Sequence, residues 1–145
     1  MVVSVPQENL LRALTRTGRI LSSKPQLPII QNVLLQTKEG RLRAVTTNLE
    51  TTVAVWVGAK VEKEGGICVS SRILTEFVVT LPAETVTLRV VDGGLSVRCA
   101  GFEALIPGVP QEEFPPAPEV KEKTGDKLGK DQLVAALGFV LFAAA

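Results

Sequence analysis

The chain has 145 residues, of which 46% are hydrophobic, and this length allows one sizeable core or one domain with part of another. The formal net charge of +1 identifies no partner, and the absence of histidine removes the commonest general base and every histidine-containing catalytic triad. Charge is uneven along the chain, because residues 1–60 hold eight Lys and Arg against three acidic residues and residues 61–118 hold four against eight. This asymmetry is compatible with one basic face, although counts this small also arise by chance.

The two cysteines, Cys68 and Cys99, lie in apolar segments typical of strands. Because no secretory signal is evident, we expect them to be buried, reduced thiols of a cytoplasmic protein. Two isolated cysteines without histidine do not supply the usual ligands of a metal site, so no metal or cofactor is expected. The carboxylates are scattered and the paired glycines have the context of hairpin turns, so no catalytic residue is predicted and the chain is not expected to be an enzyme.

The first part of the chain predicts one helix among short strands. Apolar residues recur at helical spacing after Pro6, and Val53, Val55 and Val57 alternate as in a half-buried strand. The predicted elements are a strand at 2–5, a helix at 7–22, and strands at 30–37, 41–47 and 50–57.

A similar order of elements follows. Ser71 is a candidate N-cap for a second helix, and Pro82 ends that helix. The predicted elements are a strand at 67–70, a helix at 71–81, strands at 86–91, 95–99 and 102–106, a proline-rich linker at 107–118, and a third helix at 131–145.

The two series of elements are a repeat. A shift of 53 residues aligns Gly40 with Gly93 and Leu42 with Leu95, and a shift of 123 residues aligns Leu10 with Leu133. We therefore predict an α+β fold of two strand–helix–three-strand repeats, at about 1–60 and 61–118, with both helices on one face of antiparallel sheets. Residues 119–145 begin a third copy, and we expect them to start a second domain.

The helix of the third copy is apolar on nearly all sides. The run from Leu133 to Ala145 is too short to span a bilayer. Two interpretations stay open, a core helix whose covering strands are missing and a truncated tail anchor; a core helix fits the pattern better. The chain is accordingly expected to be a fragment, without a membrane partner.

Arginines form a stripe along the first helix. Arg12, Arg16 and Arg19 fall opposite its leucines, over a length of about 10 Å, and Lys24 continues the stripe into the following loop. Such a stripe meets phosphates without reading bases. The alternative interpretation is a solvated basic face with no ligand.

Four segments, in this order, resemble the bacterial sliding clamp family, the β subunit of DNA polymerase III. They are Ser22–Ile29, Thr47–Glu50, Ile106–Pro110 with Glu113–Pro115, and Val140–Ala144. The resemblance extends over the whole chain, and strand–helix–three-strand repeats are the building unit of that family. It implies a DNA clamp fold, in which subunits of three domains pair as a homodimeric ring around double-stranded DNA and tether the polymerase without catalysing a reaction.

The resemblance also implies site residues. Arg12, Lys24 and Arg72 match basic positions of the family, whereas Arg16 and Arg19 are assigned to DNA from the helical wheel alone. Lys24 stands where arginine is usual, and Asn48 replaces the usual aspartate.

The resemblance also implies a subunit interface at the last strand, which meets the partner subunit in this family. Its expected residues are Ile73, Phe77, Ala104 and Ile106. The family's binding pocket for DNA polymerase III and the clamp loader lies outside this chain. We therefore expect a DNA processivity factor, present as a fragment that does not close a ring alone; the alternative is a small, self-contained interaction module with the same fold.

Overall fold

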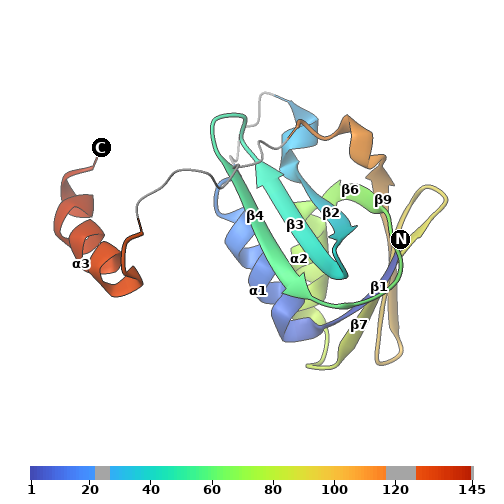
Figure 1. The fold of residues 1–145 in the computed structure, drawn as a ribbon. Coiled ribbons are helices and arrows are strands. Elements are labelled where there is room, and N and C mark those ends of the chain that lie inside the picture. Colours follow the sequence, from blue (N-terminus) through green and yellow to red (C-terminus); the bar gives the residue numbers. More distant parts are fainter. Residues whose placement is uncertain (22–26, 117–126, 145) are drawn as a thin grey trace.

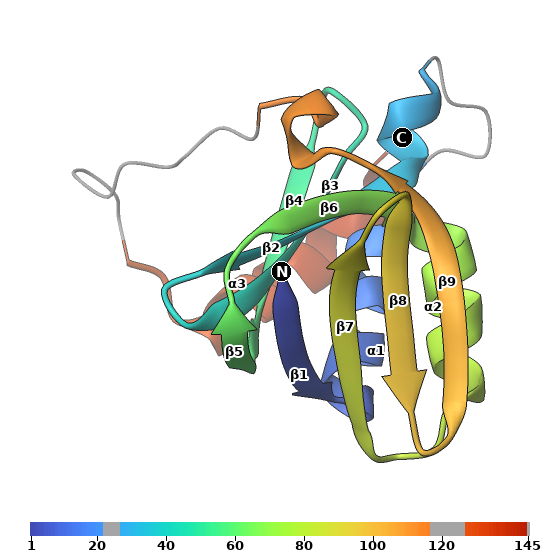
Figure 2. The ribbon, with the colours of Figure 1, turned by 90° about the vertical axis from the view of Figure 1, so that its right-hand side faces the viewer.

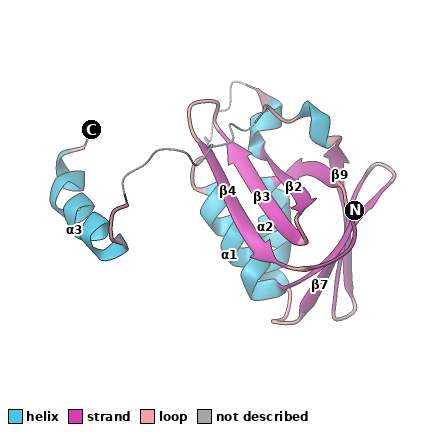
Figure 3. Cartoon of the chain, in the orientation of Figure 1, coloured by secondary structure: helices cyan, strands magenta, loops and turns pink. Residues whose placement is uncertain are grey.

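The computed structural model of the chain describes residues 1–21, 27–116 and 127–144. Its helices and strands follow the order that the sequence predicts (Figures 1 and 3). The first series is β1 (Val2–Pro6), α1 (Gln7–Gly18), the 3₁₀ turn η1 (Pro28–Gln31), β2 (Asn32–Lys38), β3 (Arg41–Thr47), β4 (Thr52–Gly58) and β5 (Lys60–Lys63). The second series is β6 (Gly66–Ser70), α2 (Ser71–Thr80), β7 (Thr85–Val91), β8 (Gly94–Cys99), β9 (Phe102–Val109) and η2 (Gln111–Glu113), followed by α3 (Lys130–Val140) and η3 (Leu141–Ala143).

The strand–helix–three-strand repeat is confirmed. The predicted shift of 53 residues carries β2 onto β7, and it carries Gly40 onto Gly93, which have φ angles of 69° and 79°. Tight hairpin turns need such left-handed backbone, which glycine adopts at little cost. The sequence does not predict β5, because three of its four residues are charged and give no apolar alternation.

Each repeat donates its first strand to the other repeat. β1 pairs with β7 and β6 pairs with β2, all antiparallel, so the strand order is β4-β3-β2-β6-β9-β8-β7-β1-β5. Within the described residues, the two halves of the sheet are joined only where Cys68 and Val69 of β6 pair with Val109 and Gly108 of β9. Figure 2 shows β6 arching over the other strands to reach this junction. Residues 102–107 of β9 pair with β8 on one side, and their other side is an open edge within the described residues.

The three largest differences from the predicted boundaries are at the ends of α1, β9 and α3. α1 ends at Gly18 instead of Ser22, since glycine favours the end of a helix over its interior. β9 continues to Val109, into the segment predicted as linker, because Gly108 allows a close approach of backbone: a Cβ there would lie 2.9 Å from the Cys68 carbonyl oxygen. The third helix ends at Val140, and a 3₁₀ turn replaces its predicted last turn.

The two helices α1 and α2 cover one face of the sheet and contact each other, which confirms the predicted layering (Figures 1 and 2). Their apolar side chains interdigitate with the inward-facing residues of both halves of the sheet. The largest fully buried side chains of this core include Leu10, Leu14, Leu35, Leu42, Leu74, Leu88 and Leu95. The repeats therefore share one core, and neither buries its apolar face without the other.

α3 differs from the other two helices. Every residue of α3 is exposed, including Leu133, Val134 and Phe139. No described helix is long and apolar enough to cross a membrane.

Candidate nucleic-acid interface

Arg12 and Arg16 lie on the exposed face of α1, opposite the buried leucines of the same helix. Their side chains line a shallow groove between α1 and the edge strand β4, whose other wall runs from Val55 to Gly58. Neither arginine has a carboxylate partner among the described residues. Both guanidinium groups are therefore available to an anion that approaches the helices from the side away from the sheet.

Arg19 and Arg72 come together at a second groove, between the end of α1 and the start of α2. The lining of this groove is mainly apolar and includes Leu14 and Leu21, together with Glu76. Arg19 and Arg72 lie at the same groove because α1 and α2, the equivalent helices of the two repeats, pack side by side. The structure thus gathers four of the five predicted basic residues on the helical face. The fifth, Lys24, lies outside the described residues.

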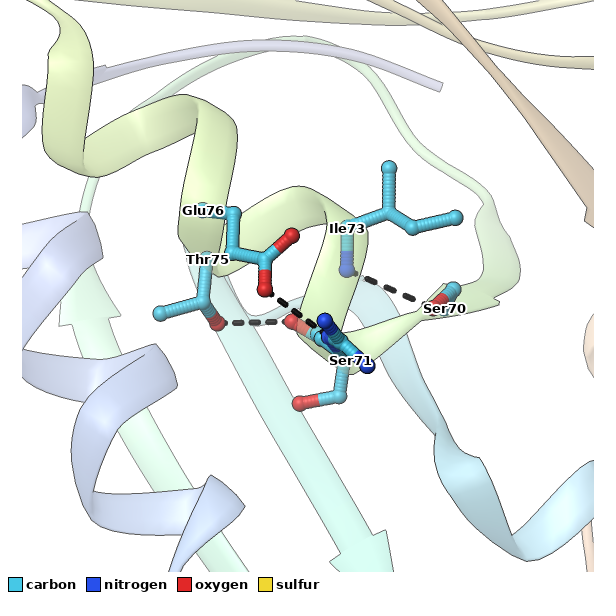
Figure 4. Close-up of polar contacts among 6 residues, drawn as sticks. Ser70, Ser71, Ile73, Thr75 and Glu76 are labelled. Atoms are coloured by element: carbon cyan, nitrogen blue, oxygen red, sulfur yellow. Dashed lines mark hydrogen bonds and ion pairs between the residues drawn. The ribbon is translucent and has the colours of Figure 1, made fainter.

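The first turn of α2 turns Arg72 outward. Ser70 is the N-cap, and its Oγ accepts a hydrogen bond from the backbone N–H of Ile73 at 3.4 Å. Figure 4 shows this bond and the hydroxyl of Thr75, which donates to the Ser71 carbonyl at 2.7 Å. The expectation that Ser71 caps the helix is wrong: Ser71 is the first helical residue and is buried. Its neighbour Arg72 consequently points to solvent.

Arg72 is engaged by an acidic residue of its own helix. Its Nε donates a hydrogen bond to Oε1 of Glu76 at 2.8 Å, one turn further along α2. This hydrogen bond, together with the charge of Glu76, raises the pKa of Arg72. The side chains are 85% and 62% exposed, so water screens the pair and an incoming phosphate can displace the carboxylate.

The residues predicted for a subunit interface divide between surface and core. Ile73 is exposed on α2, and Phe77 and Ala104 are half-buried. Ile106 is only 2% exposed and belongs to the core, because alternate residues of β9 face the helices. Ile106 is therefore a packing residue of this domain and not a surface contact.

The exposed apolar residues of β9 are ones that the sequence-based prediction misses. Phe102 and Leu105 are exposed, Leu105 at 63%. β9 pairs with β8 from Phe102 to Pro107, and within the described residues its other edge is paired only at Gly108 and Val109. The edge from 102 to 107 therefore presents unpaired backbone groups beside apolar side chains, which is a template for another strand. Strand alternation alone does not reveal this edge, since it depends on how β6 crosses to β9.

The cysteines are free and buried, as expected. Burial raises the pKa of the Cys68 thiol to about 11, and the charges of Glu113 and Glu112 add to the effect. The thiolate is the nucleophilic form, so Cys68 is poorly suited to covalent chemistry. Among the described residues, no group of three or more Cys, Asp or Glu is arranged to hold a metal ion.

Residues 1–118 match the family model for the DNA polymerase III beta subunit, N-terminal domain. The beta sliding clamp of Streptomyces coelicolor is 29% identical over 130 residues, which cover 90% of this chain and 35% of the relative. The beta sliding clamp of Synechococcus elongatus is 28% identical over 140 residues, covering 94% of this chain and 37% of the relative.

A solved structure shows the same fold. Caulobacter crescentus pol III beta superimposes with a TM-score of 0.87 at 22% sequence identity, covering 95% of this chain and 38% of that chain. The chain therefore spans little more than a third of the length of the relatives and of the solved structure that it matches.

Proposed function

The chain belongs to the DNA polymerase III beta subunit family, and we propose that it contributes the first part of a DNA sliding clamp, a non-catalytic processivity factor of the replicative polymerase. In this proposal, α1 and α2 face double-stranded DNA inside a ring. The observation that carries it is the placement of Arg12, Arg16, Arg19 and Arg72 on the helical face, away from the sheet. The proposal also includes Lys24, on the basis of the sequence, because this residue lies outside the described residues.

The chemistry of the helical face suits a clamp that moves. Its arginines are exposed, lie along shallow grooves and include no described feature that reads base edges. Contacts of this kind neutralise phosphates, release counterions and weaken as salt rises. Sequence-independent, exchangeable contacts hold DNA in place laterally and still permit sliding along it.

We propose that a partner subunit binds along β9 and the start of α2. The open edge of β9, with Phe102 and Leu105, and the nearby exposed Ile73 supply an apolar strand edge for a partner subunit in a homodimeric ring. Half-buried Phe77 and Ala104 would border it. Ile106 supports this edge from within the core.

We further propose a cytoplasmic protein in which residues 119–145 begin a second domain. In this proposal the contacts with polymerase III and the clamp loader lie outside this chain.

Fluorescence anisotropy with two short DNA duplexes of unrelated sequence tests the DNA-facing assignment. We expect weak binding of the 145-residue chain to both duplexes, with equal affinity and strong salt dependence. Replacing Arg12, Arg16 and Arg19 together by Gln should weaken binding and reduce the slope of log K against log salt by up to about 0.9 for each phosphate that is no longer neutralised. Arg89→Gln, an exposed change in β7 on the opposite sheet face, is the matched control. Equal loss of affinity in both variants would contradict the proposal.

A further inference from the structure

An aromatic cluster lies on the outer face of the sheet, away from α1 and α2. Leu42 and Ala44 of β3 point into the core, so Arg41 and Arg43 point outward, where Arg43 is paired across the strands with Trp56 of β4. The guanidinium carbon of Arg41 lies 5.1 Å from the centre of the Trp56 ring, and that of Arg43 lies 5.6 Å from it. We call Arg41, Arg43 and Trp56 the Trp56 cluster.

The stacking keeps the guanidinium groups in place without using their N–H groups; apart from this stacking, Arg41 also forms an ion pair with Glu39. Stacking on an indole ring restricts an arginine side chain and leaves its N–H groups free for a planar, bidentate acceptor such as a carboxylate. Trp56 is 41% exposed, so the cluster is open to solvent. These are the properties of a site arranged in advance for an anionic group.

One donor in the cluster has no acceptor. Nε of Arg43 is buried, and the structure gives it no hydrogen-bond partner among the described residues. A desolvated donor without an acceptor is costly, and such atoms are rare in native proteins. Because this atom is buried, a carboxylate would satisfy it only with a shift of the Arg43 side chain that exposes the Nε edge; the unsatisfied donor favours such a shift when an acceptor is present.

The surrounding charges decide which anion fits. Lys38 of β2 pairs across the strands with Arg41 and adds positive charge. Oε2 of Glu39 lies 3.6 Å from Nη2 of Arg41. Nε2 of Gln36 donates a hydrogen bond to Oε1 of Gln111 at 3.3 Å. Nε2 of Gln111 in turn donates to Oε1 of Glu112 at 3.1 Å. A continuous polyanion such as duplex DNA would meet these carboxylates, whereas one or two carboxylates of a peptide would fit between them.

Stacking of bases is also disfavoured, because guanidinium groups already lie against the Trp56 ring. Proteins that bind single-stranded nucleic acid expose such rings for the bases. Charge complementarity and the small extent of the positive surface both favour an acidic peptide over a nucleic acid.

We propose that the Trp56 cluster docks an acidic peptide segment of a partner protein, whose carboxylates pair with Arg41 and Arg43. The site lies on the sheet face opposite the helices, so it can be occupied while the helical face contacts DNA. It does not depend on the DNA-facing role proposed above.

The test uses Trp56 itself, since it is the only tryptophan of the chain and both guanidinium groups of the cluster lie against its ring. The chain is titrated with capped hexaglutamate at constant ionic strength, and hexaglutamine is the neutral control. We expect a saturable change in Trp56 fluorescence with hexaglutamate only. Arg43→Lys, which keeps the charge and loses the planar fork, should weaken binding roughly fivefold, whereas Arg89→Gln should bind like the wild type.

Three outcomes would overturn the proposal: no saturable change, equal affinity in Arg43→Lys, or tighter binding of a short DNA duplex than of hexaglutamate at the same site. The side-chain Nε–H resonance of Arg43 in the wild-type chain provides a second measurement that needs no variant. It should shift on addition of hexaglutamate, and an unchanged resonance at saturation would contradict the assignment even if the variant failed to fold.

Discussion

Nε of Arg72 lies 2.8 Å from Oε1 of Glu76, so a basic residue of the proposed DNA-facing surface is paired with an acid of its own helix. A phosphate that approaches Arg72 must compete with this carboxylate. Glu76 therefore weakens the contact between α2 and DNA, and Glu76→Gln should remove both the competition and a repulsive charge. We expect DNA affinity at low salt to rise roughly two- to threefold, as measured by anisotropy.

Glu62→Gln, an exposed change in β5, is the control for the overall change in charge. If both glutamate variants bind DNA equally well, the Arg72–Glu76 pair has no specific effect on binding.

The end of α1 is fixed to β3 by one buried hydrogen bond. Oγ1 of Thr46 donates to the Thr17 carbonyl at 2.6 Å, and both residues are fully buried. Thr46→Val keeps the side-chain shape and leaves that carbonyl without this donor. We expect the free energy of unfolding to fall by about 1–3 kcal/mol in urea titrations. Thr15→Val, an exposed change in the same helix, should change it by less than about 0.5 kcal/mol. Equal values for the two variants would contradict this role for Thr46.

Cys68 should make stability depend on alkaline pH. Its pKa in the folded chain is raised to about 11, mainly by burial, against about 8.5 in an unfolded chain. The folded state holds this proton more tightly, so the contribution is fully present below about pH 8.5 and is lost as pH rises through about 11. We expect up to roughly 2–3 kcal/mol to be lost over this window.

Cys68→Ala should remove that part of the pH dependence. The measurement is the free energy of unfolding of both proteins across the window, since lysines titrate in both and cancel in the difference. Parallel curves for the two proteins would show that Cys68 does not titrate as the structure implies.

Periodicity and the internal repeat predict most of the fold. Leucine spacing identifies α1, alternation identifies the strands, and the shift between Gly40 and Gly93 identifies the equivalent hairpins. β5 is missed because its lysines and glutamate carry no apolar pattern; it forms because its backbone pairs with β1. Such long-range pairing depends on tertiary structure that local patterns do not contain.

The sequence predicts those residues of the candidate site whose position depends only on the face of a single helix. Arg12 and Arg16 are placed by the helical wheel, whereas the meeting of Arg19 with Arg72 requires the packing of α1 against α2. The burial of Ile106 is not predicted, because the sequence alone does not say which face of β9 is covered. The stacking of Arg43 on Trp56 likewise depends on the register between β3 and β4.

The proposed function requires that the helices, and not the outer face of the sheet, contact DNA. A titration of the ¹⁵N-labelled chain with a short DNA duplex at low salt, followed by two-dimensional NMR, distinguishes the two faces. We expect the shifted resonances to map to α1 and to the first turns of α2, including the Nε–H groups of Arg12, Arg16 and Arg72. Shifts confined to the sheet face that carries Arg89 and Trp56, with the helices unchanged, would contradict the proposed function.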